Sequence, residues 1–118
     1  MPARTNNDYG YINIDDSVIA TIAGLSAMES YGIVGMASQK ATDGIFELLK
    51  RENLSKGVKV YTDGSEVVID LHVILEYGIR ISVVAENIIE KVKFNIENLT
   101  GLKVRNINVY VQGIRVEK

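Results

Sequence analysis

The sequence predicts a single α+β domain, with two long helices packed on one face of a largely antiparallel or mixed sheet and a short extra helix. Three observations support this fold class. The chain has 118 residues, which is the size of one domain. Its 47% hydrophobic and 24% charged residues are typical of a globular protein. Strand and helix patterns follow one another in the order β-α-(β)-α-β-β-α-β, which favours helices on one face of a sheet.

The chain is expected to begin with a flexible segment, residues 1–8, followed by one domain over residues 9–118. The first segment contains Pro2 and no apolar run, so it lacks the hydrophobic stretch of a secretory signal. The alternation of apolar and polar residues that follows places Ile12 and Ile14 on one face of a short strand.

A first helix is predicted after Asp15, whose carboxylate can cap it, and it should run to about Ser30 and stop near Gly32. From the helical repeat, the stripe expected to face the core is Val18, Ile22, Leu25 and Ser26, with Ile19 at its edge. The opposite side gathers four small residues, Ala20, Ala23, Gly24 and Ala27. Such a flat face lets another backbone approach closely. We therefore predict that it serves self-association, unless the domain's own last helix covers it.

The middle of the chain predicts a short buried strand over residues 33–37, a short amphipathic helix over 43–52 and a β-hairpin. The hairpin is the clearest local signal, because Asp63-Gly64 lies between two strand-like segments, 58–62 and 65–76. With these two residues as the loop, the facing pairs are Thr62 and Ser65, Val60 and Val67, and Val58 and Ile69. The apolar residues then share one face of the hairpin.

The last part of the chain predicts a helix and a final strand. The helix should run from about Ser82 to Asn98, with Thr100-Gly101 as its stop. Its apolar stripe consists of Val84, Ala85, Ile88, Val92, Ile96 and Leu99. In the strand, Ile107, Val109 and Val111 alternate with polar residues, whereas Leu102 and Val104 have the opposite parity. This change of parity predicts a bulge near Arg105-Asn106.

The residue chemistry excludes several function classes. No cysteine is present, so the chain has no disulfide, thiolate zinc site or thiol nucleophile. The net charge of −2 lacks the basic excess of a nucleic-acid binder, so no specific nucleic acid is expected. The glycines form no phosphate-binding motif. The uncharged stretch Ser17–Met28 is too short to cross a membrane, so no direct insertion is expected. We therefore predict no catalytic residues, no bound cofactor and no metal.

Asp70 and His72 share the outer face of one predicted strand, where a carboxylate and an imidazole can bind a metal or act as an acid and base pair. The single histidine excludes a two-histidine metal site, and no nucleophile is expected nearby. We interpret the pair as part of a solvated strand face. A hydrolase that uses the pair is the weakest functional alternative.

Two features are predicted to bind a protein partner. A basic cluster surrounds a helix end and a loop, and it consists of Lys50, Arg51, Lys56 and Lys59. Phe94 lies about 120° from the apolar stripe of the last helix, on a face of acidic and amide residues. A large aromatic ring is a common anchor of an interface, and the basic cluster would speed the encounter with an acidic partner.

Several segments, taken together, resemble the alkaline shock protein 23 family of Gram-positive bacteria. They are Gly10-Tyr-Ile-Asn-Ile, Ile22-Ala23, Tyr31-Gly-Ile-Val-Gly-Met, Lys56-Gly-Val-Lys-Val, Asp70-Leu71, Glu76-Tyr-Gly, Thr100-Gly-Leu-Lys-Val and Asn108-Val-Tyr-Val-Gln-Gly. Their order and spacing carry the resemblance, which covers most of the chain. The sequence departs from the family pattern at Ser82, where many relatives have proline, and at Phe94, where a polar residue is usual.

The resemblance implies a small cytoplasmic, non-enzymatic protein of cell-envelope homeostasis and stress response. In some family members it implies self-assembly and recruitment to the membrane by a separate anchoring protein. The family has no agreed catalytic residues, so none is carried over. We therefore expect an envelope scaffold or adaptor that acts through protein contacts and forms homo-oligomers. The alternative is a regulatory or binding subunit for a neighbouring enzyme such as a kinase.

Overall fold

A computed structural model describes residues 3–37 and 56–116, which form two helices and six strands. In chain order they are β1 (Ala3–Asn7), β2 (Gly10–Ile14), α1 (Asp16–Met28), β3 (Ile33–Met36), β4 (Val58–Asp63), β5 (Glu66–Glu76), α2 (Ile81–Thr100) and β6 (Lys103–Arg115). The expected fold class is confirmed as α+β with two helices. The short helix expected over residues 43–52 lies outside the described residues.

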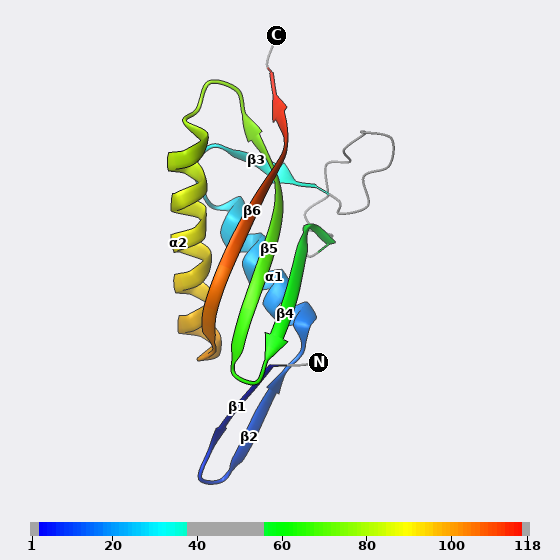
Figure 1. Cartoon of the computed structure of the whole chain (residues 1–118), viewed down its shortest axis with the longest axis vertical. Coiled ribbons are helices and arrows are strands. Elements are labelled where there is room, and N and C mark those ends of the chain that lie inside the picture. The colour runs from blue at the N-terminus through cyan, green and yellow to red at the C-terminus, as the bar shows by residue number, and fades with distance from the viewer. Residues whose placement is uncertain (1–2, 38–55, 117–118) are drawn as a thin grey trace.

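β5 is the centre of a mixed four-stranded sheet (Figure 1). β6 runs parallel to it along one edge, from Glu66 to Glu76. β4 and β3 are both antiparallel to β5 and share its other edge end to end, β4 along residues 66–71 and β3 along residues 73–75. Ala37 bridges the junction, since its backbone N–H donates to the carbonyl of His72 at 2.9 Å. Both edges of the central strand are therefore occupied.

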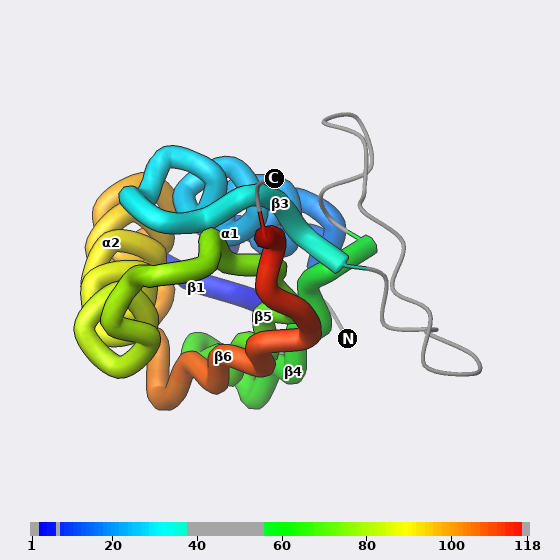
Figure 2. Tube along the Cα trace, turned by 90° about the horizontal axis from the view of Figure 1, so that it is seen from above, coloured from blue at the N-terminus to red at the C-terminus, as the bar shows by residue number. Residues whose placement is uncertain are grey.

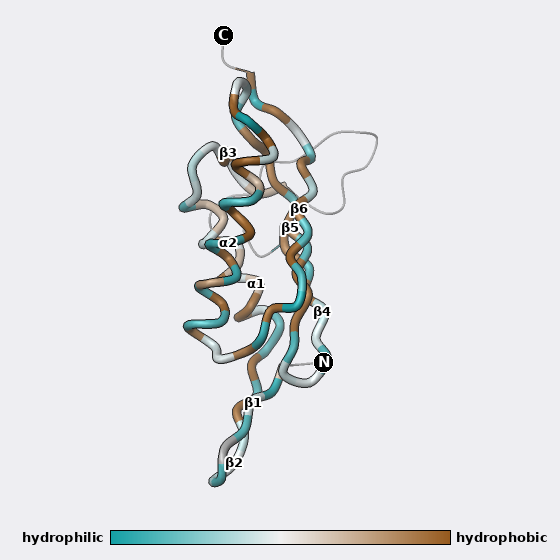
Figure 3. Tube along the Cα trace, turned by 60° about the vertical axis from the view of Figure 1, so that its left-hand side comes forward, coloured by the Kyte–Doolittle hydropathy of each residue, from teal (hydrophilic) through white to brown (hydrophobic). Residues whose placement is uncertain are grey.

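The two helices lie on one face of this sheet (Figures 2 and 3). α1 contacts β3, β4 and α2, and α2 contacts β6. The side chains of β5 that point to the helices are fully buried, and they are Val67, Ile69, Leu71, Val73 and Leu75. From α2 they meet Val84, Ile88, Val92 and Ile96. The stripe predicted for α2 is therefore confirmed at these four residues, whereas Ala85 is half-buried and Leu99 is exposed.

The amino-terminal segment is ordered into a hairpin, whereas we expected a frayed start over residues 1–8. β1 pairs with β2 in antiparallel register, and the hairpin extends beyond the end of the two-layer body (Figure 1). Its base is fixed by the buried Ala3, the partly buried Ile14 and a hydrogen bond from the Arg4 amide to the Gly64 carbonyl, 3.1 Å. The polar sequence of β1 has little strand propensity, which is why the pattern did not reveal it.

α1 presents to the core the face that we expected to be external. Ala20, Ala23, Gly24 and Ala27 are buried, together with Ile19 and Ser26. Val18 and Leu25, the expected core residues, are about half and two-fifths exposed. The small side chains allow α1 to lie close to the sheet and to α2. They are not available as an external self-association face, so this prediction is wrong.

Polar contacts join the two helices. The Asn95 side-chain amide donates to the buried Ser26 hydroxyl at 2.8 Å, and Lys91 lies 3.6 Å from Glu29. A buried hydroxyl needs such a partner, because an unpaired one would lose its hydration without compensation. Ser26 was expected in the core stripe, and this position is confirmed.

The β4–β5 turn has a different register from the predicted one. Gly64 and Ser65 form the loop, so Asp63 pairs with Glu66, Thr62 with Val67, Val60 with Ile69 and Val58 with Leu71. Gly64 has a φ of 63°, which makes it the residue that turns the chain. The predicted pairs are displaced by two residues along β5. Because the side-chain period of a strand is two, the apolar residues nevertheless remain on the predicted face.

Two further predictions are confirmed. α2 ends at Thr100, and Gly101 caps it in the left-handed conformation with a φ of 77°. Val67 of β5 pairs with Val104 of β6, and Val68 pairs with Asn106, so Arg105 is the extra residue of a bulge in β6. Because of this extra residue, Ile107 points to the same side of the sheet as Leu102 and Val104, although it lies three residues after Val104.

Candidate interaction surfaces

The outer face of the sheet, opposite the helices, carries the polar residues singled out in the sequence. Asp70 and His72 lie on β5, Lys59 pairs with Asp70 from β4, and Asn108 and Tyr110 pair with them from β6. Among the described residues, no helix or strand packs on this face (Figure 3). We call it the open sheet face.

Side-chain contacts occupy most of these polar groups. The Asn108 amide donates to the Asp70 carboxylate at 2.9 Å, and the rings of His72 and Tyr110 stack with centroids 5.0 Å apart. Arg105 donates to Glu66 and lies 3.8 Å from Asp63. Over residues 3–37 and 56–116, no three His, Asp or Glu side chains gather closely enough to bind a metal ion. The contacts on the open sheet face therefore link side chains of neighbouring strands, as on an ordinary exposed sheet surface, and do not form a site for an acid and a base.

His72 is nevertheless not fully solvated. Its Nδ1 atom is buried and has no hydrogen-bond partner among the described residues. Burial lowers the pKa of His72 below its ordinary value of 6.5, and the nearby Asp70 carboxylate opposes this shift without cancelling it. The folded protein therefore binds a proton at His72 less readily than the unfolded chain does.

This difference predicts a pH dependence of stability. Well above pH 6.5 the imidazole is neutral in both the folded and the unfolded state, so it has no effect on stability. As the pH falls below 6.5 the unfolded chain takes up the proton first, so the free energy of unfolding decreases. His72→Gln should flatten this decrease, measured by urea unfolding between about pH 7.5 and pH 5. Equal slopes for the two proteins would contradict the assignment.

The pH range of that experiment lies above the range in which Glu66 and Asp15 affect stability. The pKa of Glu66 is lowered by the Arg105 hydrogen bond and charge, and the pKa of Asp15 by hydrogen bonds from Ser17. Each ionised carboxylate stabilises the folded state at a pH above its ordinary pKa, which is 4.5 for Glu66 and 3.8 for Asp15. This stabilisation is lost as the pH falls through the pKa of the folded state. Both windows lie below about pH 5.

Phe94 and Lys59, two of the predicted partner-binding residues, lie apart in the structure. Phe94 lies on α2 with 66% of its area exposed, as predicted. Lys59 extends from β4 onto the open sheet face, where its Nζ lies 5.3 Å from the centre of the Tyr61 ring. Phe94 and Lys59 therefore lie on opposite sides of the sheet. Lys56 is exposed, and Lys50 and Arg51 lie outside the described residues.

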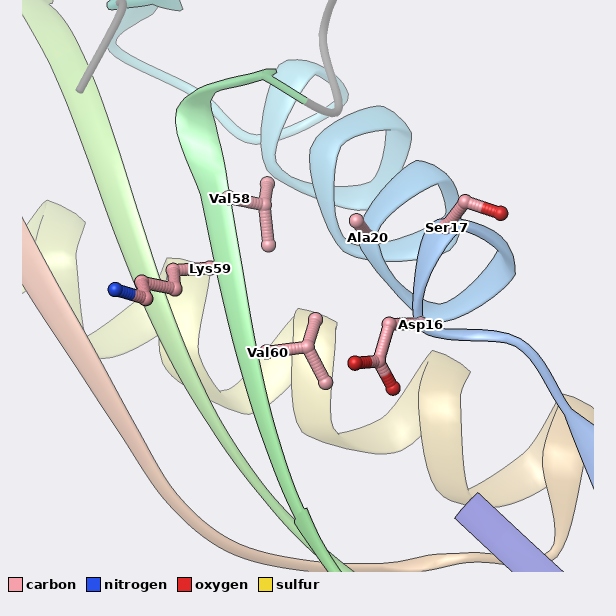
Figure 4. Close-up of a pocket in the computed structure, with 6 residues that line it drawn as sticks. All are labelled: Asp16, Ser17, Ala20, Val58, Lys59 and Val60. Atoms are coloured by element: carbon pink, nitrogen blue, oxygen red, sulfur yellow. The ribbon is translucent and has the colours of Figure 1, made fainter. Parts of the chain in front are cut away.

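A shallow cavity of about 280 Å³ lies between the start of α1 and β4. Figure 4 shows Val58, Val60, Ala20 and the Asp16 carboxylate turned toward one another, while Lys59 and Ser17 point away. Its walls are mainly apolar, and one carboxylate provides the charge. The four groups that face the cavity include no nucleophile paired with a base.

Two apolar surfaces were missed in the sequence. The hairpin exposes Tyr9, Tyr11 and Ile12, and the outward side of α1 exposes Val18, Leu25 and Met28. Tyr11 and Ile12 were visible as apolar residues, but their position on a projecting hairpin was not. The exposure of α1 was missed because apolar residues occupy its whole circumference, so the helical repeat could not show which side is buried.

Neither α1 nor α2 combines the length and the hydropathy that a transmembrane helix requires.

Comparison with known proteins identifies the family. A model of the alkaline shock protein 23 family, described as having a cell envelope-related function, matches residues 4–116. Protein YloU of Bacillus subtilis is 45% identical over 117 residues, which are 98% of each chain. Protein Spy1614 of Streptococcus pyogenes is 44% identical over 117 residues, 98% of this chain and 97% of that protein.

A more distant relative is a stress response regulator gls24 homolog of Streptococcus pyogenes, 27% identical over 92% of this chain and 61% of that protein. No solved structure matches the chain. The family model covers nearly the whole sequence, and two relatives of almost equal length share close to half of their residues with it. The chain therefore belongs to the alkaline shock protein 23 family, which its sequence segments resemble.

Proposed function

We propose that this protein is a non-enzymatic scaffold or adaptor of cell-envelope homeostasis and stress response, acting in the cytoplasm through protein contacts and self-association. A membrane-anchored protein is among the partners we expect. The family description, a cell envelope-related function, and the name of the gls24 homolog support the envelope and stress parts of the proposal.

One structural observation carries the proposal. Large apolar side chains are exposed in groups on the outward side of α1 (Val18, Leu25 and Met28) and on the hairpin (Tyr9, Tyr11 and Ile12), and Phe94 is exposed on α2. Exposed apolar patches of this kind mark interaction sites in proteins that are otherwise polar at the surface. In contrast, most polar side chains of the open sheet face contact one another, as Asn108 and Asp70 do. This distribution favours binding over catalysis.

Phe94→Ser tests the proposal. Burying the ring in an interface is worth roughly 1.5 to 3 kcal/mol, so its loss should weaken partner retention by about one to two orders of magnitude. The measurement is quantitative recovery of co-purifying proteins on immobilised protein, with and without detergent-solubilised membranes. The folded state should keep its melting temperature, because the ring is two-thirds exposed.

Leu99→Ser is the matched control, since Leu99 lies on the same helix with 68% of its area exposed. It should leave retention unchanged if Phe94 is the specific anchor. Identical protein recovery with the parent and both variants would reject Phe94 as the anchor. A partner enzyme whose activity changes on binding would instead support the alternative of a regulatory subunit.

A further inference from the structure

The hairpin of β1 and β2 is an arm that the body of the protein supports only at its base. Ala3 and Ile14 anchor it, while Tyr9 is 99% and Tyr11 60% exposed. A two-stranded hairpin in water is marginally stable without packing against something else. One side of the arm carries Tyr11 with Arg4, whose guanidinium lies 4.4 Å from the ring centre, and the other side carries Ile12. The Tyr11 side is a preformed contact surface that stays largely exposed.

The outward side of α1 is a second exposed surface. Val18, Leu25 and Met28 are 48%, 39% and 36% exposed, and they share this side of the helix. The opposite side of α1 is buried in the core. A helix that is apolar all round is normally covered on all sides. We call these three residues the α1 stripe.

We propose that two copies of this chain exchange arms, so that the Tyr11 side of each arm lies along the α1 stripe of the other copy. This inference rests on the proposed self-association and names the surface that produces it. Arm and stripe belong to the same chain, so one contact made twice about a two-fold axis uses both surfaces of both copies.

The dimensions of arm and helix match. Each five-residue strand of the arm spans about 17 Å and the 13-residue helix about 20 Å. Asp15 is the single residue between β2 and α1. Because arm and helix meet at Asp15, a two-fold axis at this junction would place each arm beside the helix of the other copy.

The charges near the axis are complementary. Arg4 lies at the base of the arm, and Asp15 and Asp16 lie at the start of α1. The two-fold arrangement brings Arg4 of one copy toward the exposed Asp15 of the other.

The exposed area is sufficient for a dimer. At roughly 200 Å² per tyrosine, Tyr9 and Tyr11 expose about 320 Å². The α1 stripe adds on the order of 200 Å², which gives each copy about 500 Å² of apolar surface. A standard interface buries about 800 Å² per partner, of which about 65% is apolar in homodimers. Complete burial of these side chains would account for that apolar share.

Sedimentation equilibrium over a concentration series tests the dimer. We expect the parent chain to dimerise and the variants Tyr11→Ser and Leu25→Ser each to raise the dissociation constant at least tenfold. Ile12→Ser, on the other side of the arm, should not change it. A parent that stays monomeric throughout, or a dimer that Tyr11→Ser and Leu25→Ser leave unchanged, would overturn the proposal.

Engineered cysteines test which surfaces meet, and the absence of native cysteine makes the experiment clean. On mild oxidation, a mixture of Tyr11→Cys and Leu25→Cys chains should form a disulfide-linked heterodimer. Ile12→Cys mixed with Leu25→Cys should not, although Ile12 is as exposed as Tyr11. Efficient cross-linking of Tyr11→Cys chains with one another would show arm against arm, and equal yields from the two mixtures would show random collision. Either result contradicts arm exchange.

The experiments can reject arm exchange and the scaffold or adaptor function independently of each other. A monomeric parent that still retains proteins through Phe94 would remove arm exchange and leave the scaffold function standing. A dimer cross-linked from Tyr11→Cys to Leu25→Cys that retains no protein would keep arm exchange and remove the adaptor function.

Discussion

Ala23→Leu is expected to lower the free energy of unfolding by about 3 kcal/mol, because Ala23 is fully buried between α1 and the rest of the core. The closely packed small residues of α1 leave no space for three further carbon atoms. The leucine must either adopt a strained rotamer or push the helix away from the sheet and α2, which loses contacts along the whole interface. We expect the melting temperature to fall by on the order of 10 °C.

Thr21→Leu is the control for this experiment. Thr21 is exposed on the same helix, and a leucine there should change stability by less than about 0.5 kcal/mol. Urea unfolding of both variants at neutral pH measures the difference. Two equally stable variants would show that the small-residue face of α1 is not in the core.

Gly32→Ala is expected to cost about 2 to 3 kcal/mol, through two separate effects. The residue has a φ of 87°, a conformation that an L-amino acid with a Cβ atom adopts at a cost. An added Cβ would also lie 3.1 Å from Ile79 Cδ1 and 3.2 Å from both methyl carbons of Val84. Gly32 must keep its place, because its carbonyl accepts the backbone N–H of Glu76 at 2.9 Å.

Gly64→Ala separates the two effects. Gly64 also has a positive φ, 63°, but an added Cβ would meet no described atom within 4 Å. It should therefore cost only the backbone term, about 1 to 2 kcal/mol. The remaining difference between the variants in urea unfolding measures the crowding against Ile79 and Val84. Equal losses would show that these side chains move aside freely.

The sequence predicted correctly those parts of the fold in which the apolar residues lie on only one side of a helix or strand. The parity change after Val104 indicated the bulge at Arg105, and the stripe of α2 was evident because polar residues fill its other side. In the β4–β5 hairpin the loop was misplaced by one residue, but strand periodicity preserved the buried face.

The errors have a physical cause as well. On α1 the larger side chains were assigned to the core, but close approach to the sheet favours alanine, so Ala23 is buried and Leu25 exposed. The arm was missed because the polar strand β1 is stabilised by pairing with β2 and by contacts of its base, which local propensity does not contain.

The candidate site was only partly predictable. Exposure of Phe94 follows from its angle on the helix, and the structure confirms it. The separation of Phe94 from Lys59 depends on which side of β4 the lysine leaves, and this follows from the pairing of Lys59 with Asp70. Sequence spacing contains no information on such long-range pairing, so the relative position of the two features could not be predicted.

The complete pairing of β5 has a consequence for aggregation. Residues 67–75 combine branched apolar side chains with few charges, which is the composition of segments that stack into intermolecular cross-β structure. In the native protein β6 occupies one edge of this segment, and β4, Ala37 and β3 occupy the other. A strand paired on both edges cannot template the strand of another chain. The resistance of the protein to aggregation thus depends on its thermodynamic stability, because each unfolding event exposes the edges of β5 that are paired in the native protein.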